Sequence, residues 1–91
     1  MTIECIFVAA APRALQLAAP DGSVRTLATD GLLGPNDVAV SAEGTVFFTD
    51  PGHFPPASER PGRIMAYGTD HRLRVFAADF VYCNGIVCEP A

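Results

Sequence analysis

The sequence predicts an all-β protein made of short antiparallel strands. Eight glycines and eight prolines punctuate the 91 residues, so the regular elements between them are short. Apolar residues recur at every second position in several segments, as at Val46 and Phe48 or at Leu73, Val75 and Ala77, which is the period of a strand and not of a helix. A segment of the N-terminal third also recurs later in the chain, which is typical of folds built from repeated sheets.

The repeat has a period of about 49 residues. Residues 21–30 (DGSVRTLATD) match residues 70–79 (DHRLRVFAAD) in both aspartates, the arginine and the first alanine, and their apolar positions coincide. Further along, Asn36 and Asn84 occupy matching places. Because this period falls in the range of β-propeller blades and the segments have strand character, the sequence predicts propeller blades, each a four-stranded antiparallel up-and-down sheet.

One full period accommodates four strands separated by turn residues. The strands expected in this blade are Asp37–Ser41, Thr45–Thr49, Arg63–Tyr67 and Leu73–Ala77. Before it we expect strands at Ile3–Ala9, Ala14–Ala18 and Val24–Ala28, and after it a strand at Gly85–Cys88. The chain therefore corresponds to about two blade equivalents of an incomplete propeller.

In sequence order, residues 1–30 form the last three strands of one blade, residues 35–79 one complete blade, and residues 84–91 the first strand of the next. Both ends then present open strand edges, whose unpaired backbone groups recruit partners. We expect a homo-oligomer through these blade edges, in which the strand at 85–88 pairs beside the strand that begins near Ile3 of a neighbouring copy. Three copies would supply six blades, so the oligomer is either a trimeric ring or irregular, and the alternative to both is a monomeric fragment.

Composition excludes several classes of partner. A net charge of -4 with only six Lys and Arg leaves no basic surface for nucleic acid. No apolar run reaches the roughly 18 residues of a membrane span, and Glu4 stands before the apolar segment 5–11 where a secretory signal would carry positive charge. Three cysteines, an odd number, fit small buried hydrophobes in a reducing compartment. We therefore expect a cytoplasmic protein without a membrane partner.

Asn36 and Asn84 are the first candidates for a site. Each would enter the innermost strand of its blade, at the mouth of the central channel. Turn chemistry explains one such asparagine equally well, but the same residue at the same place of two blades also favours a function. Amide oxygens are ligands of the kind that Ca²⁺ accepts, so the pair predicts a divalent cation. Asp37 is either the nearest carboxylate to this site, where it would also face the substrate, or a turn acceptor.

The loop 51–61 would lie on the same face and roof the channel. Asp50, at its start, either faces the substrate or caps backbone groups at the strand end. His53, within the loop, either contacts substrate or is an ordinary exposed residue. The sequence contains no catalytic triad, phosphate-binding loop or zinc signature, so the catalytic residues are unknown.

Three motifs in this order, GPNDVAV at 34–40, FFTDPG at 47–52 and NGI at 84–86, resemble the gluconolactonase and regucalcin (senescence marker protein) family of six-bladed β-propellers. The similarity covers about residues 21–86. It implies that Asn36 and Asn84 face a central divalent metal, with calcium favoured over zinc. The glutamate and the later aspartate of that family, the latter its metal ligand and base, have no counterpart here, and Cys83 stands where proline usually precedes the Asn-Gly pair.

The resemblance implies a metal-dependent lactone hydrolase that acts on a small lactone or sugar acid. This chain would be a fragment or subunit of such an enzyme, inactive as an isolated monomer. The alternative is a non-catalytic truncated propeller that acts as a binding or assembly module. A third hypothesis is a related propeller chemistry of the strictosidine synthase or arylesterase type.

Overall fold

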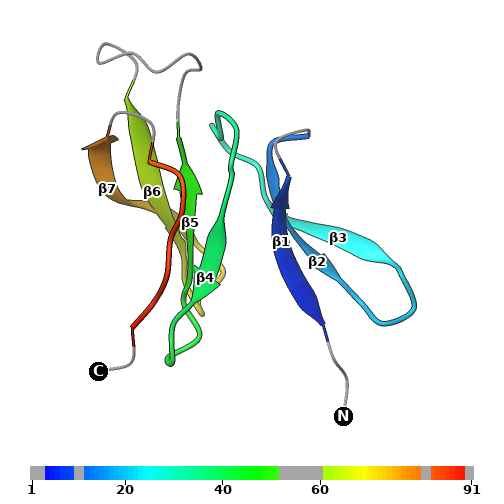
Figure 1. Ribbon diagram of the computed structural model, residues 1–91. Coiled ribbons are helices and arrows are strands. Elements are labelled where there is room, and N and C mark those ends of the chain that lie inside the picture. Colours follow the sequence, from blue (N-terminus) through cyan, green and yellow to red (C-terminus); the bar gives the residue numbers. More distant parts are fainter. Residues whose placement is uncertain (1–3, 10–11, 52–60, 81–82, 90–91) are drawn as a thin grey trace.

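The protein folds into two antiparallel β-sheets (Figure 1). This computed structural model describes residues 4–9, 12–51, 61–80 and 83–89, and within those ranges it contains strands but no helix. The strands are β1 (Cys5–Ala9), β2 (Ala14–Ala18), β3 (Val24–Ala28), β4 (Val38–Val40), β5 (Val46–Asp50), β6 (Gly62–Tyr67) and β7 (Leu73–Phe80). The all-β prediction is confirmed. The described part accordingly includes no helix of the length and apolarity needed to cross a membrane.

Strands that follow one another in sequence lie side by side in space. The first sheet has the order β1-β2-β3 and the second sheet the order β4-β5-β6-β7. Tight turns make this possible, because glycine supplies positive φ at Gly22 (89°) and Gly44 (91°), where other residues are strained. At the first of these turns, the Asp21 carboxylate also accepts the backbone N–H of Ser23 at 2.9 Å. The sequence therefore encodes up-and-down sheets through local turns alone.

The strand expected at Gly85–Cys88 is not formed. Residues 83–89 have no regular secondary structure and pair with no described strand. They lie instead against the second sheet, where the carbonyl of Asn84 accepts the hydroxyl of Thr49 at 2.6 Å and the N–H of Ile86 reaches the Asp37 carboxylate at 3.0 Å. A strand forms where its backbone pairs with the backbone of a neighbouring strand. The two contacts of this segment are made instead with side-chain groups, one hydroxyl and one carboxylate, so no strand results.

The two sheets repeat the same pairing pattern. Leu17 pairs with Arg25 in the first sheet as Ala66 pairs with Arg74 in the second. A register shift follows at the same place, after Leu15 in the first sheet and after Ile64 in the second. A bulge inserts one residue and bends the strand. The outer hairpins of the two sheets, β2–β3 and β6–β7, therefore carry the same irregularity at matching residues. The sequence repeat is therefore also a repeat of backbone structure.

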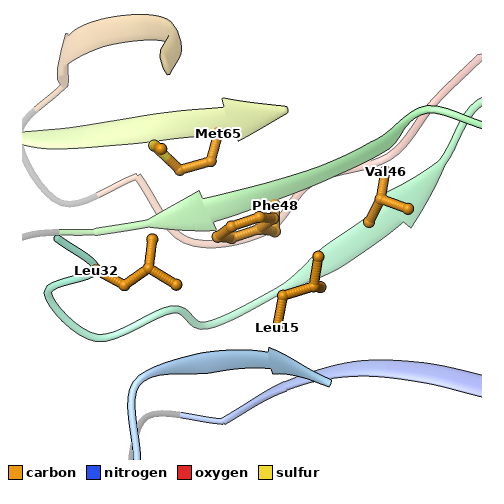
Figure 2. Packing of buried hydrophobic residues seen from close by; sticks show 5 residues of the cluster. All are labelled: Leu15, Leu32, Val46, Phe48 and Met65. Carbon is orange, nitrogen blue, oxygen red and sulfur yellow. The ribbon is translucent and has the colours of Figure 1, made fainter. Parts of the chain in front are cut away.

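The core lies between the two sheets (Figure 2). Figure 2 shows Leu15 of the first sheet pointing toward Phe48 and Val46 of the second. Phe48 and Leu15 are fully buried, and Leu32 from the connecting loop and Met65 from β6 complete the cluster. Apolar residues at alternate strand positions reach this core because successive side chains of a strand point to opposite faces.

The sheets use opposite faces for this contact. The second sheet contributes Val46, Phe48 and Met65 to the core, whose counterparts by register in the first sheet are Cys5, Phe7 and Gln16. The first sheet instead contributes Leu15, with Ile6, Val8 and Leu27 packed against the cluster. Successive sheets are thus stacked back to front, so one face of each sheet is left outside this core.

Candidate metal centre

Asn36 and Asn84 are both held at Thr49, near the end of β5. The backbone N–H of Asn36 donates to the carbonyl of Thr49 at 3.0 Å. The hydroxyl of Thr49 donates to the carbonyl of Asn84 at 2.6 Å. One buried threonine therefore brings together the chain's only two asparagines, which are 48 positions apart in the sequence.

Both asparagine side chains are exposed, because the hydrogen bonds that anchor these residues use backbone atoms. Neither residue has the left-handed backbone that often explains asparagine in turns. Among the described residues, positive φ at a non-glycine position occurs at Arg13, His71 and Asp79. The two amides are therefore available to a ligand, and backbone conformation does not account for them.

Asp37 serves the local structure with both carboxylate oxygens. Oδ1 accepts the N–H of Val38 at 2.9 Å, and Oδ2 accepts the N–H of Ile86 at 3.0 Å. The backbone N–H of Asp37 donates to the Thr49 hydroxyl, and the carbonyl of Asp37 accepts the backbone N–H of Thr49. Asp37 thus acts as the backbone acceptor that the sequence allowed, and it tethers the segment after β7 to the start of β4.

Asp50 takes the capping role of the two that the sequence left open. Its side chain is fully buried and accepts the N–H groups of Leu33 and Gly34, at 3.0 and 2.8 Å, in the loop before β4. Its other oxygen pairs with Nη2 of Arg63 at 2.7 Å. The carboxylate is therefore surrounded by protein donors, which is how a buried charge is retained.

Arg63 extends this network to the connection between the sheets. The same Nη2 donates to the carbonyl of Gly31 at 2.7 Å. Its Nε is buried and has no partner among the described atoms. Cys83 packs against the same residue, with its thiol donating to the Arg63 carbonyl at 3.4 Å, and burial raises the pKa of that thiol. Arg63 therefore joins the loop before β4, the end of β5 and the segment after β7.

Thr49 and Arg63 organise the candidate site by their hydrogen bonds, and sequence reasoning missed both. The repeat itself carries a signal for them. By strand register, Thr49, Asp50 and Arg63 of the second sheet correspond to Val8, Ala9 and Ala14 of the first. Where one repeat unit has a polar residue and the other unit has an apolar one at the matching position, the polar residue indicates a role that is specific to its own unit.

His53 lies outside the described residues, as does most of the loop 51–61. Within the described ranges, no three His, Cys, Asp or Glu side chains lie close enough together to hold a metal ion. Asparagine amides are not among those side chains, so the asparagine pair is a separate candidate. What the arrangement offers chemically is two exposed asparagine side chains, each on a residue whose backbone is hydrogen-bonded to Thr49.

Comparisons with known proteins add no relative to this picture. No protein-family model matches the chain, and neither a curated protein nor a solved structure matches it significantly.

Proposed function

We propose that this chain is part of a β-propeller of the gluconolactonase and regucalcin type, and that Asn36 and Asn84 contribute oxygen ligands to a divalent cation, calcium before zinc. The observation that carries the proposal is the convergence of two repeat-related asparagines on Thr49 with both amides exposed. With the rest of the ligand shell supplied by the other blades of the assembled ring, the activity would be hydrolysis of a sugar lactone or another small lactone.

The blade assignment is supported by the two sheets. Their outer hairpins share the same register and the same bulge, and the sheets stack back to front. Repeated sheets that pack in this way around an axis are the plan of a propeller. Because each sheet uses only one of its faces for the common core, the other face of each sheet is free to pack against a further sheet.

The residues present fit a cation in part. Calcium takes roughly six to eight oxygen ligands, including side-chain amides and carboxylates, and the two asparagines offer two neutral ones. The carboxylates of Asp37 and Asp50 already accept protein donors. A bound divalent cation would polarise a lactone carbonyl and activate water. This chain's own contribution is therefore to hold two amides in place, and none of its described residues is assigned as the base.

A second function, a non-catalytic binding or assembly module, is favoured by the same carboxylates. Asp50 is fully buried in its ion pair, and each oxygen of Asp37 accepts a backbone N–H. A general base must reach the proton that it removes. Neither carboxylate is placed to do so, which separates cation binding from catalysis in this chain.

Calorimetric titration with Ca²⁺ tests the proposal. Asn36→Ala and Asn84→Ala should each weaken binding at least about tenfold, as for loss of groups that support a metal site, while the thermal unfolding midpoint stays near that of the wild type. Ser23→Ala is the control, because Ser23 is exposed in the turn between β2 and β3, where its hydroxyl donates to Asp21 outside the site. Absence of Ca²⁺ binding, or equal loss in all three variants, would refute the cation site.

A lactone hydrolysis assay with Ca²⁺ present then separates the two functions. Turnover that disappears in both asparagine variants supports the hydrolase. Binding without turnover supports the module.

A further inference from the structure

Two parts of the chain lack the strand neighbours that the repeat assigns to them. β1 is an edge strand of the first sheet in the described structure, where a strand equivalent to β4 would lie. Residues 86–88 match β4 in the repeat, yet they pair with no described strand, and Val87 is 78% exposed. Open edges and unpaired extended segments are templates for strand addition.

An aromatic face is also uncovered. Phe76 of β7 is 65% exposed and stacks edge to face on Phe47, with ring centroids 5.0 Å apart. Its counterpart in the first sheet, the residue at the same bulge, is Leu27, which packs against the core formed with the second sheet. The face of the second sheet that carries Phe47 and Phe76 is therefore the one on which a further sheet of this kind would stack.

We infer that a second copy of this chain supplies both missing neighbours. Residues 86–88 of one copy add to β1 of the next copy, and the first sheet of that next copy stacks on the Phe47–Phe76 face. The product is a four-stranded sheet with the order of β4-β5-β6-β7. The inference rests on the blade organisation of the proposed function but is independent of its cation.

The first sheet carries the complementary face. Its outward residues are Cys5, Phe7, Gln16 and Ala18, which correspond by register to Val46, Phe48, Met65 and Tyr67. Those four belong to the contact that the second sheet makes with the first within one chain. A second copy therefore reuses a packing arrangement that the chain already contains. The contact is head to tail, and three copies would close the ring expected from the sequence.

The segment cannot complete the first sheet of its own chain. Thr49 and Asp37 hold residues 84–86 on the second sheet. Thr49 follows Phe48, which faces the first sheet, so its side chain points to the opposite face. Figure 1 shows the C-terminal segment and the first sheet on opposite sides of β4 and β5. A segment in that position can pair only with a strand of another molecule.

The repeat fixes the register of the added strand. Within the chain, Val40 pairs with Val46 between β4 and β5. The corresponding pair between copies is Cys88 of one copy with Cys5 of the next. The neighbouring pair, Ser41 with Thr45, is hydrogen-bonded, so the Val40–Val46 position and its counterpart are non-hydrogen-bonded. Such positions have Cα atoms about 4.5 Å apart, a spacing that a disulfide can bridge.

The first test is the mass in solution, measured by light scattering on the full chain in reducing, metal-free buffer. We expect three times the chain mass of 9.6 kDa. Phe76→Ser should shift this mass to that of one chain with the circular dichroism spectrum unchanged, because the ring is exposed in the single chain. Val40→Ser, at a residue 49% exposed on β4 outside the proposed contact, should keep the oligomer. A monodisperse wild-type monomer, or a Phe76→Ser variant with unchanged mass, overturns the inference.

The second test uses the cysteines, all of which are free thiols. Diamide oxidises two thiols to a disulfide and is itself reduced to the hydrazine. We expect a cross-link between Cys5 and Cys88 of different copies, identified by mass spectrometry, which Cys5→Ser and Cys88→Ser abolish and Cys83→Ser retains. Cross-links through Cys83 in place of Cys88 overturn the register. Because no step uses a cation, assembly without Ca²⁺ binding would contradict the proposed site alone, and Ca²⁺ binding by a monomer would contradict the assembly alone.

Discussion

Replacing Asp50 tests whether the buried ion pair holds the two sheets together. Asp50→Ala removes an acceptor that serves Leu33, Gly34 and Arg63 at once. Two backbone N–H groups in the loop before β4 and one guanidinium then lose their partner. Since that loop also carries Leu32 into the core, the substitution acts on the connection between the sheets.

The expected cost follows from burial. Removing one member of a buried pair typically costs about 3 to 5 kcal/mol. The Asp50 side chain is 0% exposed, but that of Arg63 is 26% exposed and keeps some hydration, so we expect about 3 kcal/mol, near the lower bound of that range. A chain of this length has a total stability of roughly 5 to 14 kcal/mol. The loss is therefore a large fraction of what holds the fold.

Urea unfolding followed by far-ultraviolet circular dichroism, at one fixed protein concentration, measures this loss. Asp50→Asn keeps one acceptor oxygen and should cost about half as much. Arg63→Ala and the double variant complete a mutant cycle, in which the double variant should lose at least about 1 kcal/mol less than the sum of the two single ones. Additive losses, or a loss below about 1 kcal/mol for Asp50→Ala, would show that the pair does not act as a unit.

Three further substitutions or measurements address other parts of the molecule. Phe48→Ala empties the centre of the core and should cost about 3 to 5 kcal/mol by the same urea measurement; an effect below about 1 kcal/mol would mean that the sheets do not pack through this ring. Thr49→Val removes a hydroxyl that donates to the Asn84 carbonyl and accepts the N–H of Asp37, so it should cost about 2 kcal/mol while weakening Ca²⁺ binding as Asn84→Ala does; unchanged affinity would show that the threonine does not support the site. Because burial raises the pKa of Cys83, less of its thiolate exists at a given pH. In the Phe76→Ser variant, which we expect to be a single chain with Cys5 exposed, maleimide should therefore modify Cys5 first and Cys83 increasingly as the pH rises; equal rates at neutral pH would contradict the burial.

Local chemistry determined the elements that sequence alone could predict. Alternating apolar residues and glycine-containing turns gave the seven strands, because these signals act within a few residues of one another. The observed strand ends differ from the predicted ones where pairing with another strand determines where a strand ends. β7 continues to Phe80, beyond the expected end at Ala77, because Phe80 finds a partner in Gly62. A strand end of this kind depends on a residue far away in the sequence.

The asparagines of the candidate site could be predicted from the sequence, whereas the residues that anchor them could not. Repetition pointed to Asn36 and Asn84. Thr49 is an ordinary strand residue in the sequence, and its role appears only where the segment after β7 returns to it. The Asp50–Arg63 pair was missed because the predicted strands ended at Thr49 and began at Arg63, one residue short of placing these opposite charges directly across from each other.

The difference between the two sheets determines the symmetry that any assembly of this chain can have. Thr49 of the second sheet anchors Asn84 through its hydroxyl, and the matching residue of the first sheet is Val8, which has none. Asn36 is instead held through the Thr49 carbonyl. The two asparagines are thus equivalent in the repeat but not in their anchoring. A ring of three copies would therefore present its amides in two alternating sets of three, and a cation on its axis would meet threefold symmetry.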